Sequence, residues 1–207
     1  MDQNLILEDE PPPSGEIQIS NLTTSASQKL GFRMITIGNR VPSEYFIVQG
    51  VGESDLGYHP GAFDLALEKA GIPNYNLVSY SSLLPKNAKR IDPVKNYEHG
   101  AVLEAITAEA KGLLYPKLLT AGIIITKVTK NGELVGGLVA EYNGEGTREE
   151  CADYLSANMA SMVKRRYGEE VETDSEFFIE SIEPKSKYAC ALVVIGFTSY
   201  KVPILAV

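Results

Sequence analysis

The sequence has no tryptophan and few of the residues that bind transition metals, since it holds only two cysteines and two histidines. His59 and His99 stand alone, without the HxxH, HExxH or CxxC spacings that form metal sites. Cys151 and Cys190 lie far apart, so they could form a disulfide only if the fold brought them together. We therefore expect no metal site and two buried free thiols.

The sequence also lacks an excess of positive charge. It has 19 lysines and arginines against 27 aspartates and glutamates, which gives a formal net charge of −8. Affinity for a phosphate backbone comes from clustered lysine and arginine, so we expect no nucleic-acid partner. A cationic substrate is weakly favoured by the same charge.

Long apolar runs are absent. A membrane-spanning helix needs about 18 or more consecutive apolar residues, and the sequence has no such stretch. The start, MDQNLILEDEPPPSG, is acidic where a signal peptide would be basic. We expect a cytoplasmic protein with no membrane partner.

Several common catalytic motifs are missing as well. The GVGES stretch at residues 50–54 lacks the third glycine and the following helix of a dinucleotide-binding loop, and no GxxxxGK[ST] sequence occurs. No GxSxG sequence occurs either, which leaves a hydrolytic triad without support. Nucleotide binding and serine hydrolysis are therefore disfavoured.

Composition divides the chain into a leader and a domain. Residues 1–16 combine acidic residues with several prolines, and the stretch that follows is rich in serine, threonine, asparagine and glutamine. We predict a disordered or extended leader over residues 1–30. The remaining residues, 31–207, are long and hydrophobic enough for a single domain.

Short runs of β-branched and aromatic residues predict several strands. These runs lie at residues 33–38, 44–52, 75–85, 100–110, 176–184 and 188–200. Periodicity alone leaves residues 100–110 between helix and strand, and the strands that follow favour a strand. Two further apolar runs at residues 119–130 and 133–142 are joined by Asn131–Gly132, which predicts a hairpin.

Two helices are expected. One runs from Pro60 to Gly71, a proline at the start and a glycine at the end being the usual asymmetry of a helix. The other spans residues 147–168, because Thr147 and Glu150 have the spacing of a capping box. Its apolar stripe comprises Leu155, Met159, Met162 and Val163. Strands interrupted by two helices predict an α+β fold with mostly antiparallel sheets.

A pair of serines, Ser81–Ser82, carries the main functional hypothesis. Adjacent serines are usually only turn or edge-strand residues. Here, however, the sequence NLVSYSSLLPKNA resembles the self-processing site of the pyruvoyl-dependent arginine decarboxylases, in which two hydroxyl residues precede a short apolar segment and a proline. The resemblance extends over residues 50–144 through Phe63–Asp64, the asparagine-rich NYN before the strand, EHGAVLEAI, KNGELVGG and AEY, and it is strongest to the bacterial branch.

This resemblance implies that the chain cuts itself. The hydroxyl of Ser82 would attack the carbonyl of Ser81, and elimination from the resulting ester would leave a pyruvoyl group at position 82. The products would be a β chain of residues 1–81 and an α chain of residues 82–207. The implied cofactor is this covalent pyruvoyl group, without a metal and without pyridoxal phosphate.

The resemblance also implies roles for individual residues. Glu141 would donate the proton that replaces carbon dioxide, since burial beside apolar residues favours the neutral carboxyl. Asp64 would bind the guanidinium group of the substrate. Leu67 would touch the aliphatic stem of the substrate, and Asn76 and Ser81 would line the site. Without the resemblance, Asp64 would be interpreted as a solvated helix residue and Leu67 as a core residue. Asn76 would be interpreted as a turn residue, and Glu141 as an outward-facing glutamate at the end of a strand.

The family resemblance implies a four-layer α-β-β-α sandwich that assembles as a trimer or a pair of trimers, with each active site at a subunit boundary. The implied reaction is decarboxylation of L-arginine to agmatine and carbon dioxide, in the service of polyamine synthesis or acid resistance. Two alternatives stay open. The chain could act on another amino acid by the same chemistry, or it could be an unprocessed, non-catalytic paralogue.

Overall fold

The structure is a computed structural model that describes residues 39–94, 97–113 and 118–202. The predicted leader over residues 1–30 and the predicted strand at residues 33–38 lie outside the described residues. Among the helices that are described, none is long and apolar enough to cross a membrane.

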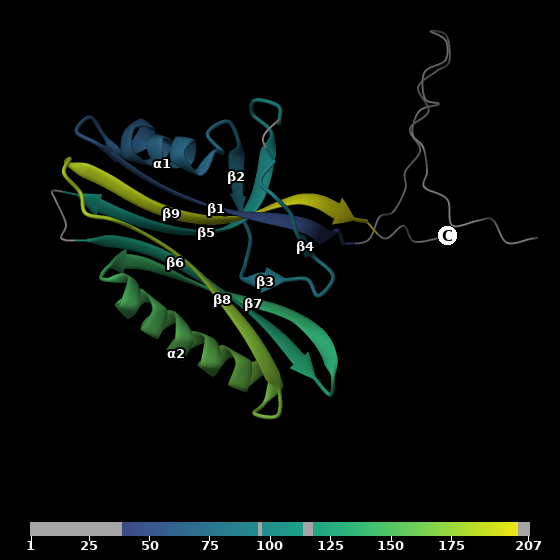
Figure 1. Cartoon of the computed structure of the whole chain (residues 1–207). Helices are drawn as coiled ribbons and strands as arrows, with labels where there is room; N and C mark the ends of the chain where they lie inside the picture. Colours follow the sequence, from purple (N-terminus) through teal and green to yellow (C-terminus); the bar gives the residue numbers. More distant parts are fainter. Residues whose placement is uncertain (1–38, 95–96, 114–117, 203–207) are drawn as a thin grey trace, which may run out of the picture. The chain divides into compact units, whose positions relative to one another are not determined.

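The first of two sheets has five strands in the order β2-β5-β9-β1-β4 (Figure 1). Its strands are β1 (Val41–Ser54), β2 (Asn76–Ser79), β4 (Lys89–Arg90), β5 (Val102–Leu113) and β9 (Tyr188–Lys201). The three long strands β5, β9 and β1 pair antiparallel, and the short edge strands β2 and β4 pair parallel to their neighbours. The prediction of a strand at residues 100–110 is therefore confirmed.

The second sheet has four antiparallel strands in the order β3-β7-β6-β8. They are β3 (Leu83–Leu84), β6 (Leu119–Lys130), β7 (Glu133–Glu145) and β8 (Glu172–Ile182). The predicted hairpin is formed by β6 and β7. At its turn, Asn131 and Gly132 have φ angles of 53° and 76°, a left-handed conformation that these two residue types tolerate.

Helix α1 (Phe63–Ala70) packs against the five-stranded sheet and ends at Gly71, as predicted, with a φ of 76°. The expected start at Pro60 is wrong, because Tyr58–Ala62 forms a wider turn in which His59 and Pro60 leave helical geometry. Pro60 itself has φ −90° and ψ 24°, so the regular helix begins only at Phe63. Gly50 allows the helix to approach closely, since a Cβ there would lie 2.1 Å from a backbone oxygen of α1.

Helix α2 (Arg148–Tyr167) covers the four-stranded sheet. The predicted capping box is confirmed, since the Thr147 side chain accepts from the Glu150 amide and the Glu150 carboxylate accepts from the Thr147 amide. Of the predicted apolar stripe, Met162 is only partly buried. The buried residues of the helix are Cys151, Leu155, Met159 and Val163.

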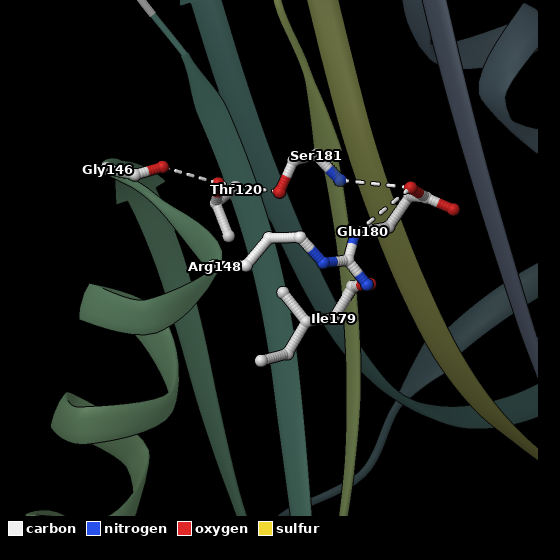
Figure 2. A network of polar contacts seen from close by, with 6 residues as sticks. All are labelled: Thr120, Gly146, Arg148, Ile179, Glu180 and Ser181. Carbon is white, nitrogen blue, oxygen red and sulfur yellow. Dashed lines mark hydrogen bonds and ion pairs between the residues drawn. The ribbon is translucent and has the colours of Figure 1, made fainter.

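A polar network fastens the start of α2 to the sheet (Figure 2). The Arg148 guanidinium donates to the carbonyl oxygen of Ile179 and lies 3.7 Å from the carboxylate of Glu180. Beside it, the hydroxyl of Thr120 lies 2.9 Å from that of Ser181 and donates to the Gly146 carbonyl at 2.6 Å. The network joins β6, β8 and the loop before α2, so it fixes where the helix begins.

Three apolar clusters define four layers. The inner cluster lies between the two sheets and includes Ile106, Ile123, Val139 and Val193. An outer cluster packs α1 on the first sheet, and another packs α2 on the second, so that the helices cover opposite faces (Figure 1). The predicted α+β fold with an α-β-β-α sandwich is confirmed.

The two cysteines lie in different outer clusters, Cys190 under α1 and Cys151 under α2. Both are free and buried, as predicted, because two sheets separate them. Burial raises the pKa of each thiol to about 11.

The predicted single strand over residues 75–85 is wrong in an instructive way. It consists of two short strands in different sheets: β2 pairs with β5, and β3 pairs with β7. Between them, residues 80–82 pass from the first sheet to the second, and we refer to them as the crossing segment. The side chains alternate between two faces throughout residues 75–85, but this alternation does not reveal that the partner strand changes.

Candidate active site

Backbone hydrogen bonds hold the crossing segment from both sheets. On the first side, the Tyr80 amide donates to the carbonyl oxygen of Ala105 on β5 at 2.8 Å. On the second side, the Val139 amide on β7 donates to the carbonyl oxygen of Ser82 at 3.1 Å. The Ser81–Ser82 peptide bond therefore lies where the chain is anchored before and after it.

The carbonyl of Ser81 has its own hydrogen-bond donor. The Leu83 amide donates to this oxygen at 2.8 Å, which closes a tight turn around Ser82. A fixed amide donor stabilises negative charge that develops on a carbonyl oxygen during nucleophilic attack. The Leu83 amide is placed to stabilise such charge on the Ser81 carbonyl oxygen.

The hydroxyl of Ser82 contacts Glu141. Ser82 Oγ donates to Glu141 Oε1 at 2.7 Å, although the two residues are 59 positions apart. Glu141 lies on β7 two residues after Val139, and therefore on the face of the strand that is turned toward the inner cluster. Ser82 is partly buried and Ser81 is exposed.

Burial raises the pKa of the Glu141 carboxyl above its ordinary value, and the hydrogen bond from Ser82 opposes this effect in part. Desolvation disfavours the charged form of a carboxyl, so Glu141 keeps its proton to a higher pH than an exposed glutamate does. A carboxyl of this kind can donate a proton near neutral pH more readily than one with an ordinary pKa.

The other predicted site residues lie elsewhere in the chain. Asp64 is exposed on α1, on the outer side of the five-stranded sheet, whereas the Ser82–Glu141 pair faces the inner cluster. Leu67 is buried in the outer cluster beneath α1, and only 7% of its surface is exposed. Asn76 begins β2, and its side-chain amide donates to the Gly100 carbonyl at 2.8 Å. Within one chain, the structure brings together Ser81, Ser82 and Glu141 but not Asp64.

Sequence reasoning missed a second carboxyl beside the crossing segment. Glu104 on β5 is buried with only 7% of its surface exposed, and its carboxylate accepts a hydrogen bond from the Tyr80 hydroxyl at 2.8 Å. A charged residue within the apolar run of a buried strand was the signal that could have pointed to it.

Across residues 39–94, 97–113 and 118–202, no three histidine, cysteine, aspartate or glutamate side chains are arranged to hold a metal ion.

Most of the chain matches a known protein family. The sequence model described as pyruvoyl-dependent arginine decarboxylase matches residues 44–202, which include α1, α2 and all of the strands except the first three residues of β1. The chain belongs to the pyruvoyl-dependent arginine decarboxylase family. This confirms the resemblance that was inferred from the serine pair and its neighbours.

Individual members of the pyruvoyl-dependent arginine decarboxylase family are similar over most of the chain. The pyruvoyl-dependent arginine decarboxylase AaxB of Chlamydia abortus is 36% identical over 187 residues, covering 79% of this chain and 94% of its own. The AaxB protein of Chlamydia pneumoniae is also 36% identical, over 185 residues with the same coverage. The pyruvoyl-dependent arginine decarboxylase of Thermococcus kodakarensis is 32% identical over 161 residues, covering 77% of this chain and 97% of its own.

Membership of the pyruvoyl-dependent arginine decarboxylase family implies a decarboxylating lyase whose cofactor is a covalently bound pyruvoyl group. The residues at the crossing segment fit the precursor of such a group. Ser82 supplies a hydroxyl next to a carbonyl that is already hydrogen-bonded, and that hydroxyl contacts a carboxyl with a raised pKa.

Proposed function

We propose that the chain cleaves itself between Ser81 and Ser82 and then decarboxylates L-arginine to agmatine and carbon dioxide. The observation that supports this most directly is the hydrogen bond of 2.7 Å between the Ser82 hydroxyl and Glu141, next to the hydrogen-bonded Ser81 carbonyl. The names of the relatives support arginine as the substrate.

Self-cleavage proceeds in three chemical steps. Ser82 Oγ bonds to the carbonyl carbon of Ser81 while the peptide C–N bond breaks, and the released nitrogen takes up the hydroxyl proton. Loss of the Cα proton of residue 82 then expels the Ser81 carboxylate and leaves a dehydroalanine. Addition of water and loss of ammonia convert this residue to the pyruvoyl group. The Leu83 amide stabilises the oxyanion of the first step.

The two proposed products stay in one folded domain, which we take to span residues 31–207. Residues 1–81 contain β1, which pairs with β9 of residues 82–207 from Val41 to Ser54. Cutting a single bond in the crossing segment removes none of these pairs. The new carboxylate of Ser81 therefore stays close to position 82.

Once formed at position 82, the pyruvoyl group would supply an electron-accepting carbonyl for the amine of the substrate, which is the chemistry that decarboxylation needs. Glu141 then donates a proton to the substrate carbon, which its raised pKa favours. Asp64 binds the guanidinium group, Leu67 contacts the aliphatic stem, and Asn76 and the Ser81 carboxylate line the site.

Asp64 can reach the site of Ser82 only across a subunit boundary, because α1 lies on the outer side of the five-stranded sheet. We therefore propose a trimer or a pair of trimers in which α1 of one subunit faces Ser82 of the next. The acidic charge and the absence of long apolar runs support a cytoplasmic enzyme.

The decisive experiment combines intact mass with substrate turnover. We expect the purified chain to yield two fragments that meet at Ser81–Ser82, the larger one carrying a ketone that reacts with hydroxylamine. The same sample should release carbon dioxide from arginine faster than from lysine or ornithine. A stable full-length chain would overturn the proposal, and a preference for another amino acid would overturn the assignment of arginine.

A further inference from the structure

Glu104 is a buried carboxylate that the proposed reaction does not use. It lies on β5 next to Ala105, whose carbonyl oxygen accepts a hydrogen bond from the Tyr80 amide. A buried carboxylate is costly unless it is paired and hydrogen-bonded. The partners of Glu104 therefore indicate what it holds in place.

Each carboxylate oxygen of Glu104 has a different partner. Oε2 accepts the hydrogen bond from the Tyr80 hydroxyl at 2.8 Å, and Oε1 forms an ion pair with Arg40. The Arg40 guanidinium also lies over the ring of Tyr200, 5.0 Å from its centroid. The ring of Tyr80 packs against Phe197 at a centroid distance of 5.4 Å.

Tyr80 is the residue immediately before the Ser81–Ser82 pair, and it is the point where β2 has ended and the crossing begins. We propose that Arg40, Glu104 and Tyr80 form a clamp that positions the Ser81 carbonyl for attack and afterwards holds the new chain end at the active site. This proposal rests on the proposed self-cleavage. The three members of the clamp are positioning residues, since they act through Ser81.

The clamp joins the two sides of the cut. Arg40 and Tyr80 belong to residues 1–81, whereas Glu104 belongs to residues 82–207. After cleavage, Tyr80 and Ser81 become a chain end, and chain ends fray unless they are tied down. With the clamp in place, the side chain of Tyr80 adds a second anchor to the single backbone bond that it makes to Ala105.

A cavity of about 420 Å³ lies beside the clamp, and one of its lining residues provides a matched control variant. Arg40, Glu104, Thr198 and Tyr200 are among its lining residues. Thr198 Oγ1 is buried and has no hydrogen-bond partner in the part of the chain that the structure describes. Thr198→Val therefore changes the same cavity without touching a contact of the clamp.

The test follows self-cleavage of the full chain over time and then the kinetics of the mature enzyme. Tyr80→Phe removes one hydroxyl and keeps the ring against Phe197. Because a hydrogen bond to a charged group is lost, we expect Tyr80→Phe to slow cleavage by about tenfold or more. In the mature enzyme we expect KM for arginine to rise about tenfold, while kcat changes by less than about twofold because Glu141 is untouched. Thr198→Val should match the wild type in both measurements.

Conservative variants separate positioning from a general loss of structure. Glu104→Gln keeps an oxygen that can accept from Tyr80, so it should cleave faster than Glu104→Leu. Arg40→Lys keeps the positive charge and should likewise cleave faster than Arg40→Ala.

Two results would overturn the inference in different ways. If the wild type cleaves and Tyr80→Phe matches it in cleavage rate and KM, the clamp is refuted while the proposed function stands. If the wild type stays intact under all conditions, the proposed function itself fails, and the clamp fails with it.

Discussion

Glu104 and Glu141 are two carboxyls on opposite sides of the crossing segment, and they differ in what surrounds them. Glu104 on β5 binds a tyrosine hydroxyl and an arginine, whereas Glu141 on β7 binds the hydroxyl of Ser82 and, among the described residues, forms no ion pair. A carboxylate with a cation beside it is suited to hold a neighbour in place. A carboxyl that is desolvated without a cation keeps its proton and is suited to give it away.

The largest expected effect comes from removing the hydroxyl of Ser82, which contacts Glu141. Ser82→Ala should abolish both self-cleavage and decarboxylation, because alanine has no nucleophile and cannot become a pyruvoyl group. The check is intact mass together with carbon dioxide release. Ser81→Thr is the control, since position 81 supplies its backbone carbonyl, and that variant should still be cut. A processed and active Ser82→Ala protein would refute the assignment of Ser82.

The next largest effect is expected at Glu141, where one substitution separates its hydrogen bond with Ser82 from its role as a proton donor. Glutamine at position 141 keeps an oxygen that accepts the Ser82 hydrogen bond but cannot donate a proton as a carboxyl does. We expect Glu141→Gln to retain self-cleavage and to lose about 100- to 10,000-fold in kcat, the usual contribution of a general acid. Glu145→Gln, at the exposed end of the same strand, should be unaffected. Undiminished carbon dioxide release from Glu141→Gln would remove Glu141 from its role.

A third carboxyl, Asp64, extends the comparison to an exposed position. Asp64→Asn should raise KM for arginine by about ten- to a hundredfold, because it weakens a hydrogen bond between charged groups. It should not slow self-cleavage. Steady-state kinetics measure the first effect, and the time course of fragment formation measures the second. Glu68→Gln is the control, because Glu68 is also exposed and lies four residues after Asp64 on α1. An unchanged KM in Asp64→Asn would mean that the guanidinium group is bound elsewhere.

A smaller and graded effect is expected from pH. Burial raises the pKa of Glu141, so its proton is present below that raised pKa and is lost as the pH rises through it. We expect log kcat of the mature enzyme to fall with a slope of about −1 above a pH that exceeds the ordinary glutamate pKa of about 4.3. A profile of kcat against pH checks this expectation. The limb should be missing from Glu141→Gln, and its persistence there would assign it to another group.

The sequence was sufficient wherever a signal is local. The turn at Asn131–Gly132 requires residues that accept a positive φ, and the capping box of α2 needs only Thr147 and Glu150. Both predictions are confirmed. The four-layer arrangement and the proposed role of Ser82 came from resemblance to a family, not from periodicity.

What the sequence could not predict depends on contacts between distant segments. Residues 75–85 alternate as one strand would, yet they pair with β5 in one sheet and with β7 in the other. The contact of Tyr80 with Glu104 joins residues 24 positions apart, and no local pattern brings them together. The start of α1 was misplaced because Pro60 itself leaves helical geometry, with φ −90° and ψ 24°, although proline often occupies the first helical position.

The place of β1 in its sheet has a consequence for the order of folding and the proposed self-cleavage. This strand belongs to residues 1–81, but it lies between β9 and β4, which belong to residues 82–207. Before the cut, the chain can unfold and refold as one molecule. After the proposed cut, the same sheet would be an interleaved complex of two polypeptides, so refolding would become a second-order process and the apparent stability would fall on dilution. We therefore expect the proposed self-cleavage to follow folding.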